Sequence, residues 1–156
     1  VKASDWQQVQ ILNQELTALK PAAALRDGSH VLGKRLLRTC AELYPNLPAN
    51  HLEDLLPRLN LLTVQATLFA SQKISEEVAL ASFAFGRLNQ SLSAALRLFA
   101  IGQQAGQVLL QEQLLLIHKT VNEILENSCS PLRSFTPRVD LLQMKHSGLY
   151  TRLFRS

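Results

Sequence analysis

The sequence predicts an all-α protein: a single compact, bundle-like domain of about six helices that ends in a short C-terminal tail. The first reason is composition, because the 156 residues include 32 Leu and 16 Ala but only 8 Val and 5 Ile. Leu and Ala favour helices, whereas β-branched residues favour strands. The second reason is that apolar residues recur at spacings of three and four along most of the chain, which is the pattern of amphipathic helices.

The first two helices are expected over Ser4–Lys20 and Ala22–Tyr44. Ser4 and Asp5 are residue types that favour the N-cap position, and an apolar stripe follows them at helical spacing. Gly28 and Gly33 interrupt the second helix. Glycine is unfavourable inside a helix but lets another backbone approach closely, so we expect a tight helix crossing there. The alternative is that the helix only frays locally.

The next helical segment is expected over Asn50–Ser71. Pro57 lies inside it, so the sequence predicts a kink or two shorter helices. A further helix is expected after Ser75, which is an N-cap residue type followed by two acidic residues that complement the helix dipole. The apolar stripe of this helix is the most regular in the chain, and we expect it to pack along its full length. Its members are Val78, Ala81, Phe85, Leu88, Leu92, Ala95 and Phe99.

The last two helices are expected over Gln103–Asn127 and Thr136–His146. Gly102 separates the first of these from the preceding helix, and Thr136 with the proline after it is typical of a helix start. Gly148 then ends the regular pattern. We therefore divide the chain into a helical domain over residues 1–147 and a C-terminal docking tail over residues 148–156.

The net charge of +4 is concentrated at the C-terminal end of the chain. Residues 1–132 carry 11 basic and 11 acidic side chains, whereas the last 24 residues carry five basic side chains and one acidic side chain. A basic tail on a neutral body suggests docking to an acidic partner, and less strongly to nucleic acid or a membrane. The alternative is that these charges only keep the protein in solution.

Several chemical classes lack support in the sequence. With only Cys40 and Cys129, neither a disulfide framework nor a zinc finger can be assembled, and the four histidines do not pair at metal-ligand spacing. Phosphate-binding glycine loops and nucleophile motifs are also missing. The longest aliphatic run, over residues 114–117, is too short to span a membrane, and no signal peptide pattern is visible at the start. We expect a cytoplasmic protein that is not an enzyme and needs no metal or cofactor.

Three segments of the chain resemble the UreF family of urease accessory proteins. Residues 94–107 match the family's A-A-x-R-L-x-P-L-G-Q-x-x-G-Q stretch, and residues 144–156 match its terminal M-R-H-E-x-L-Y-S-R-L-F-R-S. Residues 25–33 look like its L-R-x-x-S-x-x-x-G helix. The order and the spacing of the three segments agree with the family.

The sequence departs from the family pattern in four places. Ala100 stands where the family has proline, Ser147 replaces a glutamate, and Ala66 replaces a glycine of the middle helix. The family's N-terminal third, with its L-P-x-G-x-x-x-x-S-x-G-L-E segment, has no counterpart here. The resemblance therefore runs from about Leu16 to Ser156.

The resemblance implies a set of partners. Family members are all-α homodimers that bind a second accessory protein, UreD, which is called UreH in some species. That complex recruits the nickel-carrying GTPase UreG and delivers nickel to apo-urease. By resemblance this chain is a scaffold and chaperone subunit without catalysis of its own, with no nucleic-acid or membrane partner.

The tail combines the residue types of a docking segment. It offers apolar anchors and arginines whose forked donors suit carboxylates, and aromatic residues and arginines are enriched at binding hot spots. We expect it to be ordered by its partner; the alternative is a frayed terminus that packs on its own domain. The candidate residues are His146, Tyr150, Arg152, Leu153, Phe154 and Arg155.

A second candidate surface is the turn at Gly102, Gln103 and Gln107, which the resemblance suggests as a contact for UreG. The alternative is that the two amides satisfy open backbone groups at the facing helix ends. Arg97 lies just before this turn, where it can form a salt bridge to a partner or to its own body. Because UreF has been regarded as similar in fold to GTPase-activating proteins, Arg97 and Gln103 are candidates for acting on GTP hydrolysis. The alternative is that the protein only holds its partners in register, and in that case neither residue needs to act on GTP.

Two other classes of protein compete with the scaffold interpretation. One is a helical nucleic-acid-binding or generic adaptor module that uses the basic tail, and steep loss of affinity with salt would identify nucleic-acid binding. The other is a small hydrolase or transferase, which would need a pocket with perturbed titratable groups.

Overall fold

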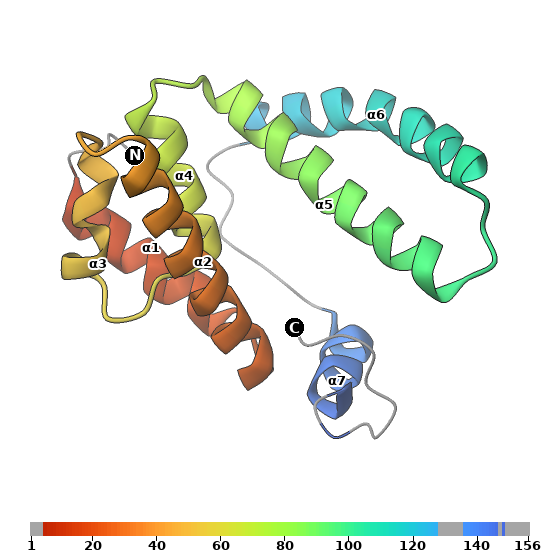
Figure 1. Ribbon diagram of the computed structural model, residues 1–156, viewed down its shortest axis with the longest axis horizontal. Helices are drawn as coiled ribbons and strands as arrows, with labels where there is room; N and C mark the ends of the chain where they lie inside the picture. The colour runs from red at the N-terminus through yellow and green to blue at the C-terminus, as the bar shows by residue number, and fades with distance from the viewer. Residues whose placement is uncertain (1–4, 128–135, 147, 149–156) are drawn as a thin grey trace. The chain divides into compact units, whose positions relative to one another are not determined.

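The computed structural model describes residues 5–127, 136–146 and 148. Within these residues the chain forms seven α-helices, one 3-10 helix and no strand, which confirms the predicted all-α class. In chain order they are α1 (Trp6–Ala18), α2 (Ala23–Leu43), η1 (Pro48–His51), α3 (Leu52–Leu55), α4 (Leu61–Ser71), α5 (Glu76–Leu98), α6 (Gln103–Glu126) and α7 (Pro137–His146) (Figure 1). Contacts group α1 to α4 with α7 in one compact unit, and α5 with α6 in a second.

Helix starts follow the capping signals in the sequence. The carboxylate of Asp5 accepts a hydrogen bond from the backbone N–H of Gln8 at 3.2 Å and caps α1. The hydroxyl of Ser75 accepts one from the backbone N–H of Val78 at 3.4 Å and caps α5. Each side chain satisfies an N–H group that the first helical turn leaves without a partner. The predicted N-caps at Asp5 and Ser75 are therefore confirmed.

Pro57 divides the segment that was expected over Asn50–Ser71. Residues 56–60 are not helical and separate α3 from α4. Leu56 is extended, with φ −122° and ψ 116°, because the proline ring disfavours helical geometry in the residue before it. The prediction of two helices in place of one is confirmed, and the break places an extended strip of backbone against α1 and α2.

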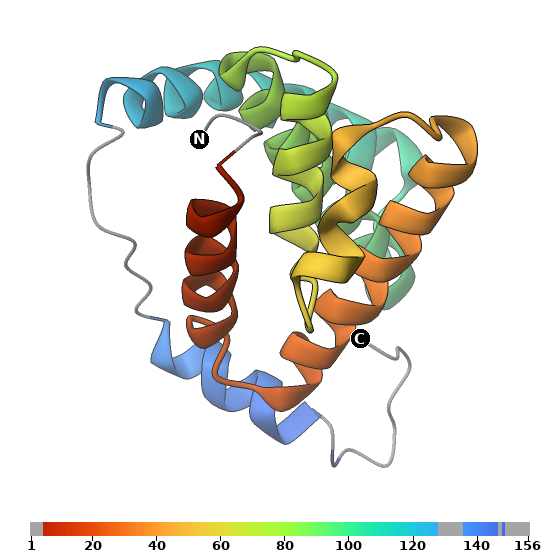
Figure 2. The same cartoon turned by 90° about the vertical axis from the view of Figure 1, so that its left-hand side faces the viewer.

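The apolar core of the first unit lies between α2, α4, η1 and α3. Helices α2 and α4 contact each other, and α1 also contacts α4 (Figures 1 and 2). Burying each large apolar side chain stabilises the fold by about 1.5–3 kcal/mol relative to leaving it exposed. The buried cluster consists of Val9, Leu37, Ala49, Leu52, Leu56, Leu59, Val64 and Leu68.

Three consecutive backbone N–H groups at the start of α4, those of residues 59–61, donate to side chains of α1 and α2. The N–H of Leu59 donates to Nδ1 of His30 at 3.1 Å, that of Asn60 to Oδ1 of Asn13 at 2.9 Å, and that of Leu61 to Oγ of Ser29 at 3.1 Å. Buried backbone groups need such partners where no helix supplies them. These bonds fix residues 58–61, hereafter the 58–61 segment, between the two helices.

Gly33 is the place where the 58–61 segment crosses α2. A β-carbon on Gly33 would lie 3.0 Å from the carbonyl oxygen of Leu59 and 3.3 Å from the backbone nitrogen of Leu61. The expected close approach of another backbone is confirmed at Gly33, but the middle of a crossing helix does not make it. The approaching backbone belongs to an extended segment.

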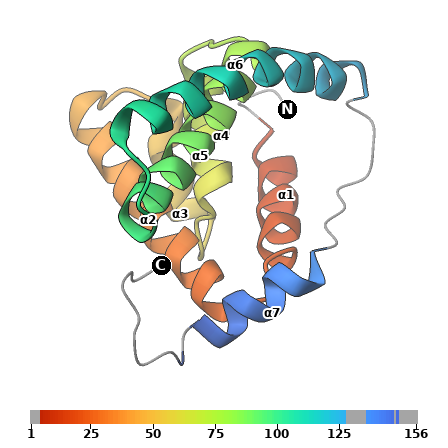
Figure 3. The same cartoon turned by 90° about the vertical axis from the view of Figure 1, so that its right-hand side faces the viewer.

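The second unit is a helical hairpin of α5 and α6 (Figure 3). Its buried residues are Gly106, Ile117 and Val121 of α6, and none of the residues of α5 is buried. Val78 is 54% exposed and Phe85 is 43% exposed. The prediction that the stripe of α5 packs along its full length is therefore wrong within the described structure, because α6 leaves part of this stripe uncovered.

None of the helices in the described part of the chain is both long enough and apolar enough to cross a membrane.

Candidate partner-binding site

Four of the predicted site residues, Arg97, Gly102, Gln103 and Gln107, lie where α5 connects to α6. Helix α5 closes with a hydrogen bond from the backbone N–H of Phe99 to the carbonyl of Ala95 at 2.9 Å. Residues 99–102 then make the connection, and Gly102 is the N-cap residue of α6. We call this end of the hairpin, residues 97–107, the tip.

The two glycines of the tip have different environments. A β-carbon on Gly106 would lie 3.2 Å from methyl carbons of both Leu92 and Leu96, so this glycine lets α6 pack closely on α5. A β-carbon on Gly102 would meet nothing within 4 Å. Gly106 therefore serves the packing of the hairpin, whereas Gly102 has no such packing requirement.

The polar side chains of the tip face solvent. Arg97, Gln103 and Gln107 are all exposed, and Arg97 lies in the last turn of α5, where a positive charge complements the helix dipole. The side-chain amide of neither glutamine makes a hydrogen bond within the described residues. The alternative that these amides satisfy backbone groups at the facing helix end is therefore not found there.

Exposed apolar residues accompany these polar groups. Leu98 is 51% exposed and Phe99 is 65% exposed at the end of α5. Aromatic residues and arginine are the side chains most enriched at binding hot spots. The tip therefore offers amide, guanidinium and apolar groups within one short stretch of chain.

A second exposed apolar surface lies along α6. Val108 and Leu115 are seven residues apart, as are Leu109 and Leu116, so the four share one side of the helix. All four are exposed, and Leu115 is 78% exposed. We call these four residues the outer face of α6. Exposed apolar patches of this kind mark protein–protein contacts.

The predicted tail site falls almost wholly beyond the described structure. His146 is the last residue of α7 and is partly buried, whereas Leu142 and Met144 of the same helix are 62% and 46% exposed. The remaining candidates lie outside the described residues, so their role stays a prediction. They are Tyr150, Arg152, Leu153, Phe154 and Arg155.

Residues 25–33, which carry the L-R-x-x-S-x-x-x-G pattern, serve the fold of the first unit. Arg26 donates through Nη1 to the carbonyls of Lys20 at 2.7 Å and Pro21 at 2.8 Å, and so fixes the turn between α1 and α2. Ser29 accepts the hydrogen bond from the 58–61 segment, and Gly33 admits that segment. Three of the four patterned residues thus have a structural task.

Sequence reasoning did not identify Asn13 as a key residue. Asn13 is 5% exposed, donates through Nδ2 to the carbonyl of Arg58 at 2.8 Å and accepts from the N–H of Asn60. The available signal was its position four residues after Val9, inside the apolar stripe of α1. A polar residue there points to a buried hydrogen-bonded group.

Two further observations complete the electrostatics of the described structure. Lys34, whose ammonium lies 2.8 Å from Glu53, lowers the pKa of that carboxyl below its ordinary value of 4.5, and Arg38 acts in the same direction. No group of three His, Cys, Asp or Glu side chains comes together as a metal site among the residues described.

Comparison with known proteins identifies the family. The described helices make this an all-α protein with an exposed tip. The family model of UreF matches its residues 1–114. The chain therefore belongs to the UreF family of urease accessory proteins. The matched range includes the patterned residues 25–33 and 94–107, so the resemblance read from them is confirmed.

A curated relative shows the same likeness. The urease accessory protein UreF of Bacillus sp. (strain TB-90) is 28% identical over 149 residues, which cover 93% of this chain and 66% of the relative. The chain thus spans about two thirds of the length of that relative.

Proposed function

We propose that this chain acts as a scaffold in urease maturation. It binds UreD (UreH), recruits the GTPase UreG, and holds these partners in register while nickel passes to apo-urease. It works in the cytoplasm as a homodimer and performs no chemical step of its own. Membership of the UreF family supports this role, and the exposed side chains of the tip supply a surface that a partner protein can bind.

The tip is the proposed contact for UreG. Its supporting observation is that the amides of Gln103 and Gln107 are exposed and make no hydrogen bond within the described residues. The two residues are four apart on α6 and therefore share a face. Each amide carries two N–H donors and a carbonyl acceptor that a partner can use.

Replacing both amides tests the UreG contact. The double variant Gln103→Ala/Gln107→Ala should bind UreG about tenfold more weakly, since each lost hydrogen bond is worth about 0.5–1.5 kcal/mol. Gln111→Ala is the matched control, because Gln111 is exposed on the same helix beyond the tip. The affinity can be measured by isothermal titration calorimetry with GTP-loaded UreG. Equal affinities for the double variant and the control would remove the tip from the interface.

Arg97 separates a docking role from a direct effect on GTP hydrolysis. An arginine that stabilises the transition state of phosphoryl transfer raises turnover by about 10³–10⁵-fold. An arginine that contributes only to docking changes the concentration of UreG that is needed for saturation, and it leaves the turnover at saturation unchanged. We therefore expect Arg97→Ala to weaken UreG binding but to leave GTP turnover at saturating UreG unchanged. A large fall of turnover at saturation would instead assign Arg97 to the nucleotide.

The outer face of α6 is the proposed surface for the second copy of the chain. Leu115→Arg places a charge at a position that is 78% exposed and leaves the buried side of α6 intact. Light scattering should then change from twice the chain mass of 17.4 kDa to a single chain mass. Asn89→Arg adds the same charge at an exposed polar position of α5, outside this face, and should stay dimeric. A dimeric Leu115→Arg variant would place the contact elsewhere.

The docking tail, residues 148–156, is the proposed segment for UreD. Tyr150, Leu153 and Phe154 supply apolar anchors, and Arg152 and Arg155 supply charge-assisted donors for carboxylates. A segment that orders on binding can wrap a large surface of its partner.

A further inference from the structure

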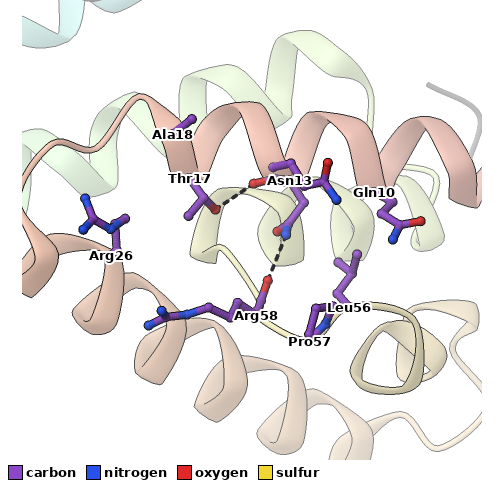
Figure 4. A pocket seen from close by; sticks show the side chains of 9 residues that line it. Gln10, Asn13, Thr17, Ala18, Arg26, Leu56, Pro57 and Arg58 are labelled. Carbon is purple, nitrogen blue, oxygen red and sulfur yellow. Dashed lines mark hydrogen bonds between the residues drawn. The ribbon is translucent and has the colours of Figure 1, made fainter.

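A groove of about 430 Å³ lies in the first unit and shares no residue with the tip or with the outer face of α6 (Figure 4). Helix α1 forms one wall, through Gln10, Gln14 and Ala18, and the chain after α3 forms the other, through Leu56 and Pro57. The start of α2 contributes Arg26. Figure 4 shows Gln10 and Arg26 at opposite ends of the groove.

The two walls are held in a fixed relation by Asn13. Its side chain donates to the carbonyl of Arg58 at 2.8 Å and accepts from the N–H of Asn60 at 2.9 Å. Thr17 donates to the carbonyl of Asn13 at 2.7 Å, on the same side of α1. A groove whose walls are already fixed needs little ordering when a ligand binds.

The surface between the walls is largely apolar. Leu56 is only 3% exposed and anchors that wall in the core. Pro57 beside it has no N–H group that would need a polar partner, and Ala18 faces the groove from α1. This part of the groove suits an apolar side chain.

One wall also carries amides that the fold does not use. Gln10 and Gln14 are four residues apart on α1 and are both exposed, and their side-chain amides make no hydrogen bond within the described part of the chain. An amide offers both donors and an acceptor. Two of them in a row along the groove match the alternating N–H and C=O groups of an extended peptide.

The end of the groove at Arg26 carries a positive charge without a carboxylate partner among the described residues. Nη1 of Arg26 is held by the carbonyls of Lys20 and Pro21, which fix the guanidinium but do not neutralise it. Arg58, the other cation of the groove, is paired with Asp27. The remaining N–H groups of Arg26 are therefore suited to a carboxylate from outside the unit.

We propose that this groove binds an extended segment of a partner protein in which an apolar residue is followed two positions later by glutamate or aspartate. In an extended segment such residues lie on the same side, about 7 Å apart. The apolar side chain lies against Leu56 and Pro57, the peptide backbone bonds to Gln10 and Gln14, and the carboxylate pairs with Arg26. The groove belongs to the first unit and the tip to the second, so this surface is additional to the proposed UreG contact.

Nuclear magnetic resonance on the full chain tests the proposal with a defined probe. The probe is the peptide acetyl-Ala-Leu-Ala-Glu-Ala-amide, and its comparison peptide has glutamine in place of glutamate. The side-chain amide signals of Gln10 and Gln14 should shift saturably with the glutamate peptide. The comparison peptide should bind about fivefold more weakly, as expected when a partly exposed ion pair is lost.

Two variants test separately the charge of Arg26 and the amides of Gln10 and Gln14. Arg26→Gln should weaken the glutamate peptide to the level of the glutamine peptide and should change the glutamine peptide little. Gln10→Ala/Gln14→Ala should weaken both peptides, and it changes only exposed side chains. In these variants binding is followed through backbone amide signals of the groove. Gln7→Ala, on the same helix but outside the groove, should change neither affinity.

Three results would overturn the proposal. The first is an absence of saturable shifts with the glutamate peptide. The second is equal affinity for the two peptides, because the charge of Arg26 would then play no part. The third is acetate shifting the same signals at the same concentrations as the peptide, which would show a site for small anions only.

Discussion

Gly33 and Leu59 approach so closely that a β-carbon on the glycine would lie 3.0 Å from the carbonyl oxygen of the leucine. The backbone of Leu59 cannot easily withdraw, because its N–H donates to His30 of α2. The next N–H groups, of Asn60 and Leu61, are held in the same way. The glycine is thus part of the arrangement that joins α2 to the chain before α4.

Gly33→Ala should lower the free energy of unfolding of the first unit. Overpacking costs about 1–3 kcal/mol, which exceeds the gain of up to about 1 kcal/mol from replacing a helical glycine by alanine. Denaturation followed by the fluorescence of Trp6, the single tryptophan, reports on this unit. Gly86→Ala is the matched control, because a β-carbon there meets nothing within 4 Å. That change should stabilise α5 by about 0.5–1 kcal/mol, measured by circular dichroism. Equal stabilisation by both changes would contradict the account of Gly33.

Asn13→Ala should destabilise the first unit more than any exposed change on α1. It leaves the carbonyl of Arg58 and the N–H of Asn60 without their partner, and each buried polar group left unpaired costs about 1–3 kcal/mol. Urea denaturation measures the loss. Gln14→Ala, one residue further and exposed, should stay within about 0.5 kcal/mol of the parent. A similar small effect for Asn13→Ala would show that water replaces the lost bonds.

Gly106→Leu should separate the two helices of the hairpin. The β-carbon alone would lie 3.2 Å from methyl groups of Leu92 and Leu96, so a full leucine side chain cannot fit without displacing α6. The expected cost is about 1–3 kcal/mol, seen as faster amide hydrogen exchange in α5 and α6. Gly102→Ser should be tolerated, since the space around Gly102 is open and serine is a good N-cap residue. Unchanged exchange in Gly106→Leu would contradict the close packing.

Glu53 should contribute to the loss of stability in acid. Its pKa is lowered in the folded state by Lys34 and Arg38, so its contribution is complete above the ordinary value of 4.5 and disappears as the pH falls through the lower folded pKa. Glu53→Gln removes this contribution. The difference in urea midpoint between parent and variant should therefore shrink from near pH 7 to about pH 3. A difference that stays constant over this range would assign the effect to something other than ionisation.

Local signals in the sequence were sufficient to predict where these helices begin and where one of them is interrupted. Asp5 and Ser75 cap helices as predicted, because a capping bond joins residues only three apart. Pro57 interrupts the helix expected over Asn50–Ser71 for an equally local reason, because proline disfavours helical geometry in the residue directly before it. The partner of Gly33 could not be predicted, because it comes from the chain after Pro57, and nothing local in α2 specifies which backbone crosses there.

The candidate site was predictable in part. The exposure of Arg97, Gln103 and Gln107 agrees with a contact role, but the pattern did not reveal that Gly106 serves packing whereas Gly102 does not. That distinction depends on the methyl groups of Leu92 and Leu96, which belong to the other helix. The regular stripe of α5 also led to an overestimate of its packing, since periodicity shows which side is apolar and not how much of it is covered.

Complex formation with UreD is the most direct test of the central claim. The full chain and a variant that lacks residues 148–156 are each mixed with UreD and analysed by size-exclusion chromatography with light scattering. The UreF protein of Bacillus sp. (strain TB-90) is run in parallel as the longer relative. We predict a stable complex with the full chain and none with the shortened variant, while the circular dichroism of the variant remains helical. If UreD elutes alone beside the full chain but in a complex with the longer relative, the scaffold role of this chain is contradicted.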